Sequence, residues 1–219
     1  MAKIPTRKDY ERAIVRDISM IAFDIETSLK RMSYFKDLKI SYDKHNQELL
    51  ILSRRHKSNS DDQLRLKVCG AQEFENSYNG SISSSLASGF LKRASCINDD
   101  YVDEAFVKES NLEQVLETVG HELGHSMMPE SWSGKPSEEA KAYAFQHLFC
   151  LNLPAPFYSM FPRKCSRPTH QAAYDFVAWE LILGKTPEEI IEEVMQTSIP
   201  FFSGPILFNR ELYIVGDKK

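Results

Sequence analysis

Two different repeats of apolar residues divide the first half of the chain. In the first stretch the apolar positions recur at alternating spacings of three and four, which is the repeat of one helix face: Ile14, Ile18, Ile21, Ile25, Leu29 and Met32. Apolar and polar residues then alternate in three short runs typical of strands, at 38–42, 48–52 and 64–68. The pattern predicts a long N-terminal helix over residues 1–37 and a sheet region over residues 38–108.

Polar, turn-rich segments separate the expected strands. Residues 56–63 (HKSNSDDQ) predict a loop. The serine- and glycine-rich residues 76–90 show no clear repeat, which fits a loop or a thin edge strand. Residues 93–101 indicate one more strand that ends in a turn. The sheet is therefore expected to be small.

Helices are expected from residue 110 onward. Ser110 and Glu113 have the spacing of a capping box and predict the start of the first helix. Its buried stripe is supplied by apolar residues three and four apart, namely Leu112, Leu116, Val119, Leu123 and Met127. Pro129 limits the end of this helix.

Three more helices are predicted in the last third of the chain. One follows Ser137, and another covers residues 169–183 and stops at Gly184. Thr186 and Glu189 form a second capping box and predict the start of the last helix. Strands followed by helices indicate an α+β fold, with one small mixed or antiparallel sheet packed on helices.

Composition narrows the class of protein. The 219 residues are 42% hydrophobic and 26% charged, which fits a single globular domain over residues 1–219. The net charge of −4 gives no positive electrostatic potential that would attract nucleic acid. No stretch predicts a signal peptide or a membrane span, and the four cysteines are widely separated, as in reduced cytosolic proteins. We therefore expect a cytoplasmic protein with no membrane or nucleic-acid partner.

The segment HELGH at residues 121–125 carries the chemistry. Residues four apart share one face of a helix, so His121 and His125 can offer two imidazole nitrogens to one Zn²⁺. Glu122 is rotated by about 100° and can reach a water bound to that ion. The histidines also face away from the buried stripe, where a cleft is expected. The spacing predicts a zinc site with Glu122 as the base that activates water.

A catalytic zinc ion needs a third protein ligand and an open position. Glu138 and Glu139 lie in the first turn of the next expected helix, which returns beside the first. Either acid is also explained by the helix dipole, so their position leaves Glu138 and Glu139 as alternatives. The metzincin completion with a third histidine is absent, because Met128 and Ser131 occupy the positions of its glycine and histidine.

HELGH followed by an acid that opens a helix resembles the gluzincin pattern of zinc metallopeptidases. The next helix has Glu139, Ala142 and Phe145 at spacings of three, followed by LFCLNLP, and is similar to the E-x-x-A-N-x-F-A…LL-x-P segment of the ImmA/IrrE family. Tyr143 and Gln146 depart from the asparagine and alanine that are usual there. The resemblance covers about residues 112–156.

This resemblance implies a fold and a function. ImmA/IrrE members are cytosolic proteases that cut repressors, so we expect a zinc metalloendopeptidase that acts on a protein or peptide. The resemblance implies a zincin-like fold in which His121, His125 and Glu139 hold Zn²⁺. The zinc-binding core would cover residues 110–156, with C-terminal helices and a tail at 157–219.

Other residues complete the expected site. The reaction needs an oxyanion donor, and His170 is the expected one among a set that also holds Tyr143, His147, Tyr158 and Tyr174. Glu117, one turn before His121, is a candidate partner of that imidazole. Substrate peptides of such enzymes add to a sheet edge, which we expect at residues 91–101.

The sequence is also compatible with functions other than proteolysis. The main one is a metallopeptidase-like domain that binds a protein partner without cutting it, a role that has no use for Glu122. Residues 188–212 weakly resemble a helix-turn-helix, but their acidity and central proline argue against it. Scattered cysteines disfavour a structural Cys/His zinc site, and a zymogen closed by the C-terminal tail is untested by sequence.

Overall fold

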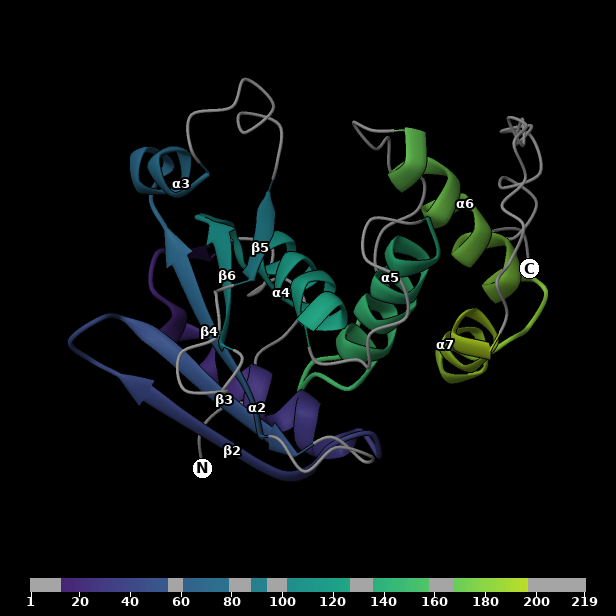
Figure 1. The fold of residues 1–219 in the computed structure, drawn as a ribbon, viewed down its shortest axis with the longest axis horizontal. Coiled ribbons are helices and arrows are strands. Elements are labelled where there is room, and N and C mark those ends of the chain that lie inside the picture. Colours follow the sequence, from purple (N-terminus) through teal and green to yellow (C-terminus); the bar gives the residue numbers. More distant parts are fainter. Residues whose placement is uncertain are drawn as a thin grey trace.

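The chain forms an α+β fold in which a mixed sheet packs on helices (Figure 1). The computed structural model describes residues 13–54, 61–78, 88–93, 102–126, 136–157 and 168–196. A five-stranded sheet has the order β2-β3-β4-β6-β5, with bounds β2 Lys36–Asp43, β3 Glu48–Arg54, β4 Asp61–Cys69, β5 Gly89–Arg93 and β6 Val102–Lys108. Only the β4–β6 pair is parallel, so the sheet is mixed and β5 forms one of its edges.

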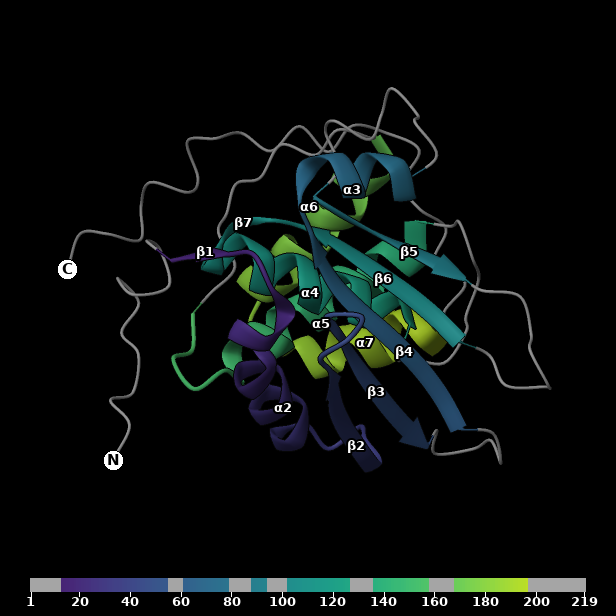
Figure 2. The ribbon, with the colours of Figure 1, turned by 90° about the vertical axis from the view of Figure 1, so that its left-hand side faces the viewer.

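The helices form layers beside this sheet. Their bounds are α2 Ala22–Arg31, α3 Ala71–Ser77, α4 Leu112–Ser126, α5 Pro136–Leu151, α6 Pro168–Ile182 and α7 Pro187–Gln196. Figure 1 shows α4 between the sheet and α5, with α6 and α7 farther from the sheet. Figure 2, turned by 90°, shows the sheet in front of these helices. The helix α4 is therefore the central element of the molecule.

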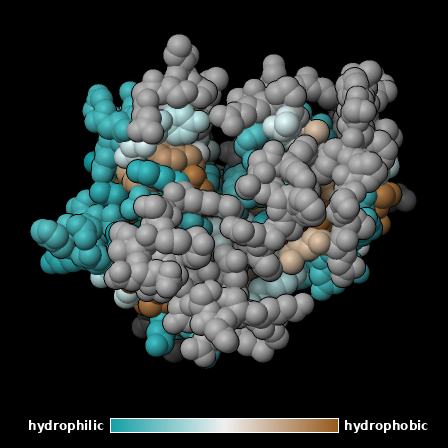
Figure 3. Space-filling model, in the orientation of Figure 1, coloured by the Kyte–Doolittle hydropathy of each residue, from teal (hydrophilic) through white to brown (hydrophobic). Residues whose placement is uncertain are grey.

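The core lies between α4 and one face of the sheet. Alternate strand residues are buried there: Leu49, Ile51, Leu64, Leu66, Ala105 and Val107. The stripe predicted for α4 meets them, because Leu116, Val119 and Leu123 are 0% exposed. Figure 3 shows hydrophilic residues at the left of the view, over the β2–β3 hairpin and α3. The alternation in the sequence thus matches an inner apolar and an outer polar surface.

The long N-terminal helix predicted over residues 1–37 is wrong where the structure describes it. The described part contains the strand β1 (Ile14–Val15), a 3-10 helix and the ten-residue helix α2. The backbone N–H of Ser19 donates a 2.7 Å hydrogen bond to Asp17, which caps the 3-10 helix, and β1 pairs with β7 (Ser110–Asn111). The predicted apolar stripe is buried from Ile18 onward, with 0% exposure at Ile18, Ile21, Ile25 and Leu29, whereas its first residue, Ile14, is 49% exposed.

Three short elements in series thus bury residues three and four positions apart, as one long helix would. The spacing of apolar residues alone cannot distinguish these two structures. The first twelve residues lie outside the described ranges.

The other predicted elements agree in outline. The three predicted strands correspond to β2, β3 and β4, and the last two helices correspond to α6 and α7. Gly184 has a φ of +91° after α6, which favours glycine at a helix end. Thr186 and Glu189 exchange the two hydrogen bonds of a capping box, 2.7 and 3.2 Å long.

Three details differ from the sequence expectations. The cap of α4 is Asn111 rather than Ser110, because Asn111 Oδ1 accepts a 2.8 Å hydrogen bond from the backbone of Gln114. The helix α3 and the strand β6 were not predicted. The strand predicted at residues 93–101 falls outside the described ranges except for Arg93.

None of the described helices combines the length and the apolar character that crossing a bilayer requires.

Candidate metal centre

Small residues let α4 and α5 approach closely. A Cβ added at Gly124 would lie 2.8 Å from the Cα of Ala142, and one added at Gly120 would lie 2.9 Å from the Phe149 ring. A side chain at either glycine would therefore push the two helices apart. Their close contact brings the HELGH segment of α4 next to the first turn of α5.

Three imidazole nitrogens surround one carboxylate oxygen at this contact. Glu139 Oε2 lies 3.3 Å from His121 Nε2, 3.5 Å from His125 Nε2 and 3.2 Å from His170 Nδ1. The Nε2 atoms of His121 and His125 are 3.2 Å apart. Glu139 Oε2 is buried and receives no hydrogen bond from the described residues. His121, Glu139 and His170 offer ligand atoms within 4.8 Å of one another, so this group could hold a metal ion.

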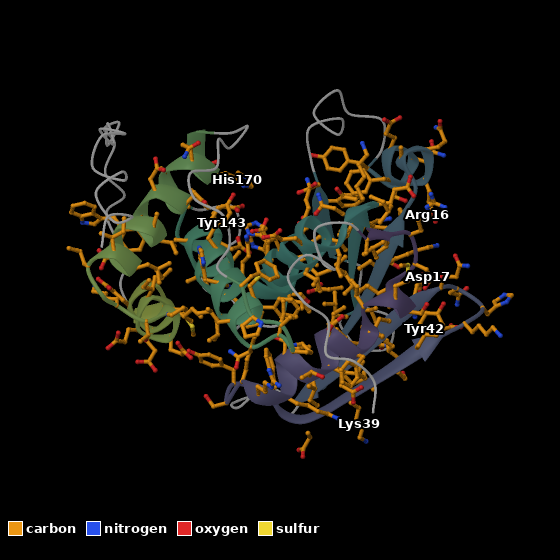
Figure 4. The ribbon with its side chains drawn as sticks, turned by 180° about the vertical axis from the view of Figure 1, so that it is seen from behind. Arg16, Asp17, Lys39, Tyr42, Tyr143 and His170 are labelled. Carbon is orange, nitrogen blue, oxygen red and sulfur yellow. The ribbon has the colours of Figure 1, made fainter. Side chains whose placement is uncertain are left out.

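Three helices contribute to the cluster. Figure 4 shows His170 at one end of α6 close to Tyr143 of α5. The Tyr143 ring packs against His121 with a centroid separation of 4.5 Å and lies 6.5 Å from the His170 ring. Tyr143 is 6% exposed, so it forms an apolar wall beside the imidazole of His121.

Burial and charge set the protonation of the cluster. Burial lowers the pKa of His121 to about 4, so this imidazole is neutral at pH 7 and has a lone pair for a metal. Burial would also lower the pKa of His125, but Glu138 and Glu139 raise it to about 9. Burial alone would raise the pKa of Glu139, yet His121 and His125 hold it well below the usual range. A cation that binds here displaces the proton of His125.

Glu122 lies beside the edge of the sheet. The side chain is buried, and a Cβ added at Gly89 of β5 would lie 2.9 Å from Glu122 Oε1. Burial raises the pKa of Glu122 to about 7. A carboxyl with this pKa can both accept and return a proton near neutral pH.

The structure distinguishes the two acids that the sequence left as alternatives. Glu139 points to the Nε2 atoms of His121 and His125, whereas Glu138 Oε1 lies 3.7 Å from His125 Nδ1. Glu117, a candidate partner of His121, makes no hydrogen bond to its Nδ1 atom, which has no hydrogen-bond partner among the described residues. Glu117 is itself buried at 5% exposure.

The remaining candidates from the sequence do not join the cluster in the described part of the chain. His147 is 1% exposed, and burial lowers its pKa to about 4, so it behaves as a core residue. Tyr158 lies outside the described residues. Of the predicted substrate edge at residues 91–101, residues 91–93 lie in the edge strand β5, and residues 94–101 fall outside the described ranges.

Sequence reasoning missed two features of the site. The packing of Tyr143 on His121 has no signal in the spacing of the motif, although the sequence offers Tyr143 as a candidate oxyanion donor. The close approach of α4 and α5 had a signal in Gly120 and Gly124, which lie four residues apart on one helix face. Small residues at that spacing allow helix backbones to come together.

No protein-family model, curated protein or solved structure matches this chain.

Proposed function

We propose that the protein is a zinc-dependent metallopeptidase whose ligands are His121, His125 and Glu139. The observation that carries the proposal is the triangle formed by His121 Nε2, His125 Nε2 and Glu139 Oε2, with sides of 3.2, 3.3 and 3.5 Å. Ligands about 2.0 Å from zinc in a tetrahedral site lie about 3.3 Å from one another. The three side chains therefore have the spacing of three corners of a zinc tetrahedron, and water is the proposed fourth ligand.

The donor set also fits zinc chemically. Two imidazoles and one carboxylate are a ligand set of catalytic zinc sites, which keep one open position. Glu139 Oε2 is buried and receives no hydrogen bond within the described ranges, which is explained if its partner is a cation. Zinc bound there would supply Lewis-acid polarisation of the scissile carbonyl and lower the pKa of the attacking water.

Glu122 is the proposed general base. Its carboxylate accepts a proton from the attacking water, and the C–O bond forms at the scissile carbonyl carbon. The same carboxyl then gives the proton to the amine nitrogen as the C–N bond breaks. A pKa of about 7 places Glu122 where both transfers are accessible near neutral pH.

His170 is the proposed donor to the oxyanion. It comes from α6, and its Nδ1 atom lies 3.2 Å from Glu139 Oε2, so its ring lies beside the proposed ligands. A protonated ring nitrogen there can donate a hydrogen bond to the negative oxygen that develops during the reaction.

The substrate is proposed to be a protein segment bound in extended form along β5. This strand is an edge of the sheet, so it can pair with an added strand. Glu122 Oε1 lies beside Gly89 of β5, which would bring a peptide bound there close to the base. The ImmA/IrrE resemblance supports a cytoplasmic protein substrate.

The test compares the whole chain with its Glu122→Gln variant. We expect one zinc ion per chain in both proteins by metal analysis, and cleavage of a peptide library only by the unchanged protein. Full activity in the variant would refute the role of Glu122. Zinc in both proteins with no cleavage by either would favour the binding domain without protease activity.

A further inference from the structure

We propose that Glu138 is the positioning residue of the metal centre, acting through the imidazole of His125. This inference rests on the proposed function, since it takes His125 as a metal ligand. The carboxylate oxygen Glu138 Oε1 lies 3.7 Å from His125 Nδ1, and each side chain is only 12% exposed. The pair is therefore held away from most of the surrounding water.

The two ring nitrogens of His125 face different partners, the proposed metal ion and Glu138. The Nε2 atom of this ring lies 3.2 Å from His121 Nε2 and 3.5 Å from Glu139 Oε2, so Nε2 is the atom that faces the proposed ion. A metal uses the lone pair of Nε2, which requires the ring proton to sit on Nδ1. Nδ1 lies 3.7 Å from Glu138 Oε1, which is longer than a hydrogen bond. A small movement of the Glu138 side chain would therefore let its carboxylate accept the proton of the metal-bound ring.

A carboxylate in this place has three effects on a histidine ligand. It favours the tautomer whose Nε2 atom is free, it fixes the rotation of the ring, and it makes the imidazole a stronger ligand. These effects act on metal affinity rather than on the reaction itself. In this proposal Glu139 binds the metal ion directly, and Glu138 orients the metal ligand His125.

The two motif histidines differ in how they are held. His121 Nδ1 has no hydrogen-bond partner in the described part of the chain, and the His121 ring packs on Tyr143 instead. His125 has the carboxylate of Glu138 behind it. Loss of Glu138 should therefore loosen one side of the ligand triangle while His121 stays in place.

A glutamate in the first turn of a helix also stabilises that helix through its dipole. Glu188 offers a control for this effect, because it lies in the first turn of α7 as Glu138 lies in the first turn of α5. The Glu188→Ala change removes the same kind of charge from a helix start away from the cluster. A difference between the two positions then reports on the contact with His125.

The experiment measures Zn²⁺ affinity by competition with a chelator for the full chain and for Glu138→Ala, Glu138→Gln and Glu188→Ala. We expect the dissociation constant to rise about 10- to 100-fold in Glu138→Ala. The rise should be smaller in Glu138→Gln, whose amide oxygen can accept the Nδ1 proton, and Glu188→Ala should match the unchanged protein. The visible spectrum of the Co²⁺-loaded protein should change in Glu138→Ala alone.

The outcomes separate this inference from the proposed function. Equal Zn²⁺ affinity in the unchanged protein and both Glu138 variants overturns the role of Glu138 and leaves the ligands standing. Failure of the unchanged protein to bind Zn²⁺ overturns both. The thermal midpoint of the metal-free proteins shows whether Glu138→Ala folds, and Glu138→Gln decides the question if it does not.

Discussion

Gly124 of α4 lies directly against the backbone of Ala142 in α5, so close that a Cβ on Gly124 would be 2.8 Å from the Ala142 Cα. This contact places the HELGH motif beside Glu138 and Glu139. The proposed metal centre therefore depends on the absence of a side chain at Gly124, which lies between its residues Glu122 and His125.

We expect Gly124→Ala to destabilise the protein by about 1–3 kcal/mol, because the added methyl group forces the helix backbones apart. Alanine is a better helix former by about 1 kcal/mol, so a loss of stability would show that the clash outweighs propensity. Urea unfolding measures the change, and Zn²⁺ affinity should fall with it. Gly70→Ala is the control, since a Cβ there meets nothing within 4 Å.

A second prediction concerns Gly89 on the edge strand β5. A Cβ at Gly89 would lie 2.4 Å from Thr118 Cγ2 and 2.9 Å from Glu122 Oε1, so Gly89→Ala must displace the Glu122 carboxylate or the strand. If the proposed function holds, a displacement of about 1 Å should lower kcat about 100-fold, with zinc content unchanged. Unchanged kcat would show that the position of Glu122 does not limit the reaction.

The C-terminal end of α5 should depend on Arg31 of α2. Arg31 Nη1 donates hydrogen bonds of 2.9 Å to the carbonyls of Asn152 and Leu153, which follow the last turn of α5. We expect Arg31→Ala to cost about 1 kcal/mol in the free energy of unfolding, because Arg31 is exposed and its bonds compete with water. The neighbouring change Lys30→Ala breaks only a surface pair with Glu26 and should cost about 0.3–0.5 kcal/mol. Equal effects of the two changes would contradict the role of Arg31.

Cys69 should be unreactive in the folded protein. The residue is 0% exposed, and burial raises the pKa of its thiol to about 12. Only the thiolate is alkylated, so at pH 8 the thiolate fraction is about 1000-fold smaller than for a thiol of ordinary pKa. Mass spectrometry after iodoacetamide treatment should find Cys69 unmodified in native protein and modified in urea. Rapid modification of native Cys69 would show that this end of β4 opens readily.

The elements that were predicted correctly are those whose signal is local. The capping box of Thr186 and Glu189 and the glycine after α6 act within a few residues, so the sequence contains their whole cause. The alternation in β3 and β4 reflects one buried face of the sheet, and in the edge strand β2 it reflects a partly buried face, at Leu38 and Ile40. The N-terminal segment failed because burial at every third or fourth residue is also compatible with a strand, a turn of 3-10 helix and a short helix in series.

The sequence by itself determined the chemistry available to this protein. It placed two imidazoles and a carboxylate on one turn of helix, and two further acids at the start of the next, because helix periodicity links spacing to direction. Only the tertiary structure decided which acid faces which nitrogen and that His170 joins them. Those relations depend on how closely α4, α5 and α6 pack, which is set by contacts between residues far apart in the chain, such as Gly124 with Ala142.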